Sequence, residues 1–205
     1  MSNEDTSIIV EPKLELAKPT RLLKLDLAAG QSPKEGFEGV DWWYKGAQHV
    51  VDLRKYPWPW EDNSVDELYC SHYCEHIEAG YINYNGIEKD AAFAFFDECY
   101  RILRPDGNMT VVVPNARSNR GFQDLTHRRF WVAESFLYLN NEWRTMNKLD
   151  HYAATCNFGV NVGHTMPTEM GLLHPDAQAR RFNESWNTIY DWVATLKSLK
   201  PASGV

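Results

Sequence analysis

Two acidic residues stand where a bound nucleoside would need a carboxylate. Asp26 ends an apolar run at 22–25, and Asp41 ends a second short run at 37–40. In an open parallel sheet the carboxyl ends of the strands meet at one rim, where a ligand can lie across the crevice. A carboxylate there can accept hydrogen bonds from two vicinal ribose hydroxyls. Gly30 lies between the acids and lets the backbone approach a ligand closely, so the pattern favours a nucleoside-bearing cofactor.

A second group of reactive side chains, His72, Glu75 and His76, follows the predicted strand 65–71. Imidazole is the commonest general base near neutral pH, so the group could take a proton from a substrate. His72 and His76, one helical turn apart, could also bind a metal, but the segment lacks the HExxH order and an obvious third ligand. We therefore expect no metal here. A hydrogen-bonded helix start remains the alternative to a substrate-facing role.

The segment 115–131 is a basic stretch in a chain whose formal net charge is -7. It follows the predicted strand 109–113 and should reach the same rim. Such a loop suggests that the ligand carries an anionic group, or that the loop closes over it as a lid. A solvated surface loop, balanced by Asp124 and Glu134, is the alternative. The basic residues of this stretch are Arg117, Arg120, His127, Arg128 and Arg129.

Short strands separated by turn residues must position these groups. Strands are predicted at 22–27, 38–41, 49–52, 65–71 and 109–113. Apolar residues that recur every three or four positions predict a helix over 90–103 and another over 183–199. The stretch 152–162 could form late antiparallel strands.

The first two connections are too short for an ordinary parallel sheet. A parallel crossover takes about a dozen or more residues because a helix must fit in it, whereas 30–37 and 42–48 hold little more than a turn. One face of the early sheet must then be covered by the amino-terminal arm, by the carboxy-terminal segment or by a second copy. A homodimer is our hypothesis, because aromatic residues, which are enriched where such surfaces close, crowd this region: Trp42, Trp43, Tyr44, Tyr56, Trp58 and Trp60.

Composition limits the class of protein. A chain of 205 residues can bury one full core, which predicts an arm at 1–20 followed by a single domain at 21–205. The excess of acid disfavours long duplex nucleic acid as a partner. No apolar run approaches the roughly 20 residues of a membrane span. The four cysteines form no CxxC pair, which indicates reduced core residues in a cytoplasmic protein.

Several motifs, in the right order over roughly half the chain, resemble a compact class I S-adenosylmethionine-dependent methyltransferase of the type-11-like, small-substrate branch. The most specific is YRILRPDG, a turn before an apolar strand that ends in Pro114. The others are Asp26 to Gly30, Asp41, Asp52 with Leu53, Pro57 to Asp66, SHYCEHI at 71–77 and LTHRRFWVAESFLY at 125–138. The resemblance implies an α/β fold with a Rossmann-like, mostly parallel sheet. The early crossover helices would be shortened or missing.

The resemblance also implies S-adenosylmethionine as the cofactor and assigns its contacts. Asp41 would hold the ribose hydroxyls, Trp42 would pack on the adenine, and Asp52 and Leu53 would meet the adenine edge. Ser71 and His72 would lie beside the sulfonium. The family usually has more glycines after the first acid, and alanine suits this place if its φ stays negative. The methionine end would be lined by Asp26, Leu27, Ala28, Ala29 and Gly30.

The implied reaction is methyl transfer to a small-molecule, sugar or lipid-linked acceptor, anionic ones included. The base candidates are His127, His76, Glu75 and His72, and the candidate substrate contacts are Arg117, Arg120, Arg128 and Arg129. A non-catalytic S-adenosylmethionine-binding partner subunit is the alternative, because a degenerate member could lose glycines and early helices. A nicotinamide enzyme would need GxGxxG before a long helix, and the sequence has neither.

Overall fold

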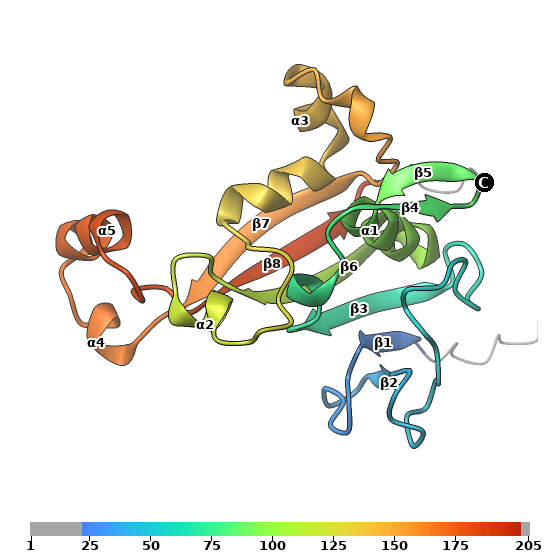
Figure 1. The fold of residues 1–205 in the computed structure, drawn as a ribbon, viewed down its shortest axis with the longest axis horizontal. Coiled ribbons are helices and arrows are strands. Elements are labelled where there is room, and N and C mark those ends of the chain that lie inside the picture. Colours follow the sequence, from blue (N-terminus) through green and yellow to red (C-terminus); the bar gives the residue numbers. More distant parts are fainter. Residues whose placement is uncertain (1–21, 202–205) are drawn as a thin grey trace, which may run out of the picture.

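The computed structural model describes residues 22–201, so the arm predicted at 1–20 lies outside the described residues. At its centre is a six-stranded sheet in the order β2-β1-β3-β6-β8-β7 (Figure 1). Strands β1, β2, β3 and β6 are parallel, and β8 pairs antiparallel with both β6 and β7. The strands are β1 (Lys24–Leu27), β2 (Glu38–Val40), β3 (Val65–Ser71), β6 (Leu103–Pro114), β7 (Phe158–Thr165) and β8 (Asp191–Ser198).

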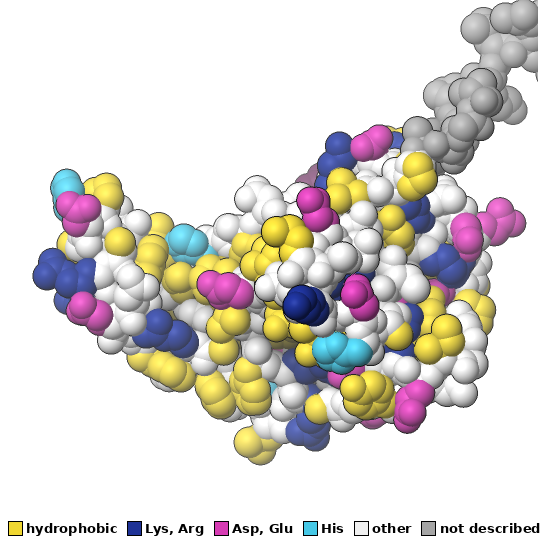
Figure 2. Space-filling view, turned by 90° about the horizontal axis from the view of Figure 1, so that it is seen from above, with side chains coloured by type: hydrophobic (Ala, Val, Ile, Leu, Met, Phe, Trp, Pro, Cys, Tyr) yellow, Lys and Arg dark blue, Asp and Glu magenta, His cyan; other side chains and the backbone are white. Residues whose placement is uncertain are grey.

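Short helices and one hairpin surround this sheet. The hairpin is β4 (Tyr81–Tyr84) with β5 (Ile87–Asp90). The α-helices are α1 (Ala91–Ile102), α2 (Asn119–Phe122), α3 (Asn141–Met146), α4 (Thr168–Gly171) and α5 (Pro175–Glu184), and the 3-10 helices are η1 (Cys74–His76), η2 (Ala133–Leu139) and η3 (Asp150–Tyr152). Helices α4 and α5 form a lobe that projects from the body at the left of Figure 2. No helix within residues 22–201 has the length and apolarity that crossing a bilayer requires.

Helix α1 supplies much of the core and confirms the helix predicted at 90–103. Asp90 caps it, accepting a hydrogen bond from the backbone N of Ala92 at 2.9 Å. Its apolar face buries Phe95, Phe96 and Ile102 completely. Strand β3 coincides with the predicted strand 65–71. All four cysteines are free and buried, as expected of core residues.

Two predicted elements are wrong. The late helix predicted at 183–199 is instead the end of α5, a loop and strand β8, whose buried residues Ala194, Leu196 and Ser198 alternate with more exposed ones. The three- and four-residue spacing of aromatic residues there spans two elements and so imitates a helix. The strand predicted at 49–52 is a single parallel bridge between Val40 and His49.

The connections between the first strands contain no helix, as the sequence predicts. The stretches 28–37 and 41–64, which join β1 to β2 and β2 to β3, contain only turns, bends, irregular backbone and the bridge residue His49. Trp42, Trp43 and Val50 are exposed on these connections, with Trp43 at 66%. The sheet therefore delivers its strand ends directly to loops, with no helix between them in this region.

Candidate functional site

The carboxyl ends of β1, β2, β3 and β6 meet at one rim because these four strands are parallel. Asp26 on β1 lies at this rim, 4% exposed, and accepts a hydrogen bond from the Lys34 backbone N at 2.8 Å. Burial raises the pKa of Asp26, and the bond and charge of Lys34 oppose that shift. A cavity of about 320 Å³ opens here, lined by Asp26, Ala28, Ala29, Ser32, Lys34, Tyr69 and Ser71.

The loop after β1 is left-handed at two positions. Gly30 has a φ of +58°, and Ala28 has a φ of +59°. The condition under which alanine suits this place, a negative φ, is therefore not met at Ala28. A non-glycine residue in this region is disfavoured by roughly 1–2 kcal/mol, and such strain is most often found at ligand sites. The turn ties back to the sheet because the Ala29 backbone N donates to the Val40 carbonyl at 3.1 Å.

Asp41 joins two loops of the rim. Its Oδ2 accepts from the Gly30 backbone N at 3.0 Å, and its Oδ1 accepts from the backbone N of Trp43 and of Tyr44, both at 2.8 Å. A carboxylate offers about four acceptor positions, so three of them serve the protein itself. About one position, on Oδ2, remains for a ligand hydroxyl.

Asp52, Leu53 and Trp42 lie together on the next part of the rim. Arg54 donates to Asp52 Oδ1 at 2.8 Å, which lowers the pKa of that carboxyl, and its guanidinium lies 4.5 Å from the Trp42 ring centroid. Leu53 is buried and its carbonyl accepts from Trp58 Nε1. A cavity of about 290 Å³ opens between Trp42, Arg54, Tyr56, Tyr73, His76, Ile77, Glu78, Ile82 and Ala91. Arg54 was not among the predicted site residues, because its stacking on Trp42 depends on the loop fold.

The four residues predicted as base candidates converge in one place. His72, Glu75 and His76 come from η1 and the residues before it, while His127 comes from the loop after α2, which lies beyond the ends of β3 and β6 (Figure 1). Together with Pro114, Arg120, Gln123 and Asp124 they line a cavity of about 480 Å³. Glu75 also fixes the loop, since its carbonyl accepts from the backbone N of Arg128 and of Arg129.

Within this histidine cavity Glu75 is the buried centre. It is 1% exposed, and its Oε1 accepts from His72 Nδ1 at 3.2 Å and lies 4.0 Å from His127 Nε2. The bond to Glu75 raises the pKa of His72, against an opposing effect of burial. The other oxygen, Oε2, has no hydrogen-bond partner in the part of the chain that the structure describes.

Hydrogen bonds to Nδ1 of His76 and of His127 fix which nitrogen of each ring carries the proton. His127 Nδ1 lies 2.8 Å from the Gly121 carbonyl, which can only accept. His76 Nδ1 lies 3.0 Å from Thr126 Oγ1, and that hydroxyl donates its own proton to Asp124 Oδ1 at 2.7 Å. Both Nδ1 atoms must therefore be donors in the neutral rings. The Nε2 lone pairs of His76 and His127 are left free.

The basic residues of the predicted stretch have partners within the protein. Arg117 donates to the carbonyls of Phe182 and Asn183, which anchors the end of α5. Arg128 donates to the Leu125 carbonyl. Arg120 pairs with Asp191 at 2.6 Å, and among the four arginines it alone lines the histidine cavity.

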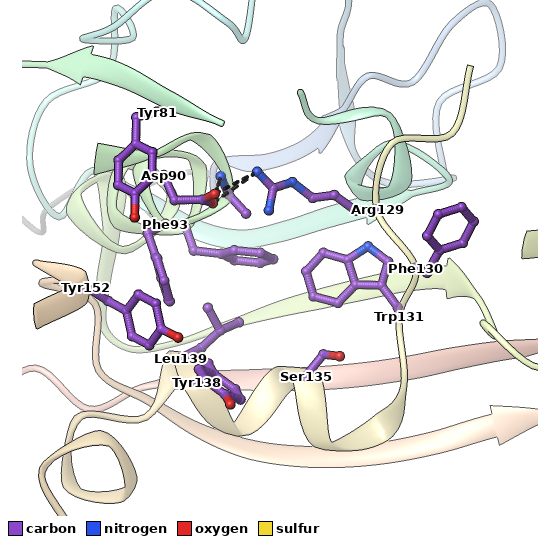
Figure 3. Close-up of a pocket in the computed structure, with 12 residues that line it drawn as sticks. Tyr81, Asp90, Phe93, Arg129, Phe130, Trp131, Ser135, Tyr138, Leu139 and Tyr152 are labelled. Atoms are coloured by element: carbon purple, nitrogen blue, oxygen red, sulfur yellow. Dashed lines mark hydrogen bonds and ion pairs between the residues drawn. The ribbon is translucent and has the colours of Figure 1, made fainter. Parts of the chain in front are cut away.

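Arg129 belongs to a separate, aromatic cavity of about 300 Å³ behind the same loop. Its Nη2 pairs with Asp90 at 3.0 Å, and Figure 3 shows this ion pair beside the rings of Phe93 and Trp131. The indole nitrogen of Trp131 is buried without a hydrogen-bond partner among residues 22–201. Sequence patterns did not single out this cavity, because its aromatic residues come from β4, α1, η2, η3 and the loop after α2.

Comparison with known proteins found similarity only at the level of structure. No protein-family model matches the chain, and no curated protein does. A SAM-dependent methyltransferase from Archaeoglobus fulgidus superposes with a TM-score of 0.55 and 16% identity, over 87% of this chain and 87% of that chain. One from Mesorhizobium loti gives a TM-score of 0.46 and 15% identity, over 86% of this chain and 91% of that chain. Identities this low show the fold alone, and the first of these structures carries that conclusion.

Proposed function

We propose that this chain, which has the Rossmann-like α/β fold of class I S-adenosylmethionine-dependent methyltransferases, binds that cofactor and methylates a hydroxyl of a small acceptor. The observation that carries the proposal is the junction of two cavities. Ser71 lines the cavity beside Asp26, and the next residue, His72, lines the histidine cavity. A donor in the first cavity and an acceptor in the second would therefore meet at the end of β3.

The residues of the first cavity fit the methionine end of the cofactor. Asp26 is a buried carboxylate whose pKa is raised by burial, so a ligand ammonium would stabilise its charged form. Ala28 and Ala29 present little side chain, which leaves room for close approach. Asp41 offers its remaining acceptor position to a ribose hydroxyl, and Trp42 with Arg54 offers a flat surface to the adenine.

The chain's own residues would align the acceptor and receive its proton. When bound, S-adenosylmethionine supplies a methyl group on a sulfonium, which is already activated for displacement. Alignment alone can contribute on the order of 7 to 11 kcal/mol. In the histidine cavity, the free Nε2 lone pair of His127 can accept the proton of a hydroxyl, and Glu75 would stabilise the imidazolium. A positioned base contributes about 10²- to 10⁴-fold in rate.

The charges of the histidine cavity favour a neutral acceptor group over an anion. Glu75 and Asp124 line it, whereas its arginine, Arg120, is already paired with Asp191. A phosphate or carboxylate would lie beside these two carboxylates, which is unfavourable. We therefore propose a hydroxyl on a small-molecule, sugar or lipid-linked acceptor. A cytoplasmic location is part of the same proposal.

The test is incubation of the protein with methyl-labelled S-adenosylmethionine and pools of hydroxylated small molecules, sugars and lipid-linked sugars. We expect label in an acceptor and stoichiometric S-adenosylhomocysteine. Binding of the cofactor without product in any pool, with and without added divalent cations, would instead support the non-catalytic partner subunit. Absence of cofactor binding would contradict both readings.

A further inference from the structure

We propose that Glu75, His76 and His127 form a binding site for a divalent transition-metal cation. One ligand atom from each of the three residues lies within 4.8 Å of the others. The two imidazole rings are 4.8 Å apart between centroids and nearly perpendicular, at 74°. Metal–nitrogen bonds of about 2.0–2.1 Å hold the ligand atoms closer together than 4.8 Å. Side-chain movements of about 1 Å would therefore complete the site.

The hydrogen bonds around the cluster leave the ligand atoms in the state that a metal requires. A metal binds neutral imidazole and a charged carboxylate. The Gly121 carbonyl holds the proton of His127 on Nδ1, and Thr126 Oγ1 does the same for His76, so both Nε2 atoms keep their lone pairs. Second partners of this kind, a carbonyl and a polar side chain on the far nitrogen, are what metal-binding histidines normally have.

The state of Glu75 is an independent observation that indicates a cation. The carboxylate is 1% exposed, its ion-pair partners among the described residues are histidines, and Oε2 lacks any hydrogen-bond partner there. A buried carboxylate with one oxygen unbonded is only partly compensated, which is unfavourable. Lysine or arginine would be the ordinary solution. Arg128 and Arg129 donate to the Glu75 carbonyl through their backbone N atoms, but their guanidinium groups contact the Leu125 and Ile77 carbonyls and Asp90.

The ligand set selects the kind of cation. Two imidazoles and one carboxylate suit Zn²⁺, Co²⁺, Mn²⁺ or Fe²⁺, whereas Mg²⁺ and Ca²⁺ prefer oxygen ligands alone. Three protein ligands leave coordination positions free, and these would face the cavity of about 480 Å³ that the same residues line. Oxygen atoms of an acceptor could occupy them, and a bound cation would then replace the Nε2 lone pair of His127, which becomes a ligand, in polarising the acceptor hydroxyl. That use of the metal rests on the proposed methyl transfer, whereas the site itself does not.

Titration of the metal-free protein with Co²⁺ and Zn²⁺, followed by visible absorption and by calorimetry, tests the inference without cofactor or acceptor. We expect one equivalent to bind, and Mg²⁺ not to displace it. In His127→Asn the amide nitrogen can still donate to Gly121, and in Glu75→Gln the side chain keeps its shape. Both variants should bind Co²⁺ more than about 100-fold more weakly than the parent. That loss is larger than the loss expected when only a hydrogen-bond partner of a ligand is removed.

Matched variants separate ligation from folding. His72→Asn removes an imidazole of the same cavity that is not a proposed ligand but a hydrogen-bond partner of Glu75, and it should weaken binding by no more than about 10-fold. Exposed His174→Asn removes an imidazole outside the cavity and should bind within about fivefold of the parent. Thr126→Val, which frees the His76 proton, should weaken binding about 10-fold. Zn²⁺ should raise the melting temperature of the parent and of His72→Asn but not of His127→Asn.

No binding by the parent, equal binding by His127→Asn, or equal losses in His72→Asn and His127→Asn would overturn the inference. Binding of metal without binding of S-adenosylmethionine would contradict only the proposed function.

Discussion

Asp41 is the residue on which the cofactor proposal depends most directly. It stabilises the turn at Gly30 and the turn at Trp43 through three backbone hydrogen bonds, and one acceptor position remains. Its place at a strand end predicted that it lies at the rim. Its bonds to the two loops could not be predicted, because they depend on how those loops curve.

Asp41→Ala should weaken the binding of S-adenosylmethionine by about 2 kcal/mol or more, roughly 30-fold, since a hydrogen bond to a charged acceptor is lost and the Gly30 turn loosens. Trp42 is half exposed beside the site, so tryptophan fluorescence should report the titration.

Asp66→Ala is the control for this variant. Asp66 also accepts a hydrogen bond from a backbone N–H, that of Leu23. It lies at the amino end of β3, so it is at the opposite end of the strand from the rim. It should lower the free energy of unfolding without changing cofactor affinity. Binding by Asp41→Ala as tight as that of the parent would refute the ribose contact.

At the scale of elements, a buried ion pair joins the hairpin to helix α1. Lys89 on β5 pairs with Asp97 on α1, and both side chains are no more than 1% exposed. Asp97 Oδ1 also accepts from the backbone N of Thr155 and of Cys156. One carboxylate therefore connects α1 with β5 and with the segment that leads into β7.

Lys89→Met should lower the free energy of unfolding by about 3–5 kcal/mol, because it leaves Asp97 buried without its cation. Urea denaturation measures this change. Adding Asp97→Asn should restore part of the loss, since the amide oxygen can still accept from the backbone. The exposed pair Lys197–Asp106 provides the comparison: Lys197→Met should cost less than about 1 kcal/mol. Similar losses at both pairs would contradict the structural role of the buried one.

Lys200, just after β8, contacts the end of helix α1. Its Nζ donates to the carbonyls of Arg101 and Leu103 and to Asn63. Burial lowers the pKa of Lys200 to about 8. The unfolded chain then keeps this proton to a higher pH than the folded protein does, so stability rises with pH between the two pKa values.

The free energy of unfolding of the parent minus that of Lys200→Met should therefore increase as pH rises from 8 to about 10.5. It should be constant below pH 7. Urea denaturation of both proteins across this range measures the difference, in which the titration of other groups cancels. A difference that is flat, or that moves the other way, would contradict the shifted pKa.

Elements were predicted correctly from the sequence where a single hydrophobic period ran through the whole element. Helix α1 and strand β3 each carry a single unbroken pattern and were predicted correctly. The stretch from 183 to 199 mixes a helix end, a loop and a strand, so its aromatic residues happen to fall at helical spacing. Strand β8 is stabilised by pairing with β6 and β7, which is tertiary information that no local pattern contains.

At the scale of the whole molecule, the candidate site depends on a contact between distant segments. His127 and Glu75 are far apart in sequence, and the fold brings them within 4.0 Å. The sequence predicted each as a rim residue but found no third metal ligand, because the path of the loop after β6 sets their distance. Arg117 and Arg129 of that loop illustrate the same limit, since their carbonyl partners belong to other segments.

The homodimer hypothesis is tested by the mass of the particle. Trp42, Trp43 and Val50 expose apolar surface on the connections that lack helices, and such surface is often covered by a partner. Light scattering at micromolar concentration should give a mass near twice that of the chain, and Trp43→Glu should reduce it to one. A monomeric mass for the parent would count against the dimer.

Strand β8 lies between β6 and β7 and is the last strand of the described residues in the chain. During synthesis β6 and β7 emerge from the ribosome first, and both lack the strand that lies between them until β8 follows. Until then the sheet has an open edge at β6, the kind of edge that recruits other chains. Ribosome stalling or truncation before Asp191 would therefore expose the nascent protein to aggregation, although the rim at β1, β2 and β3 would already have been synthesised.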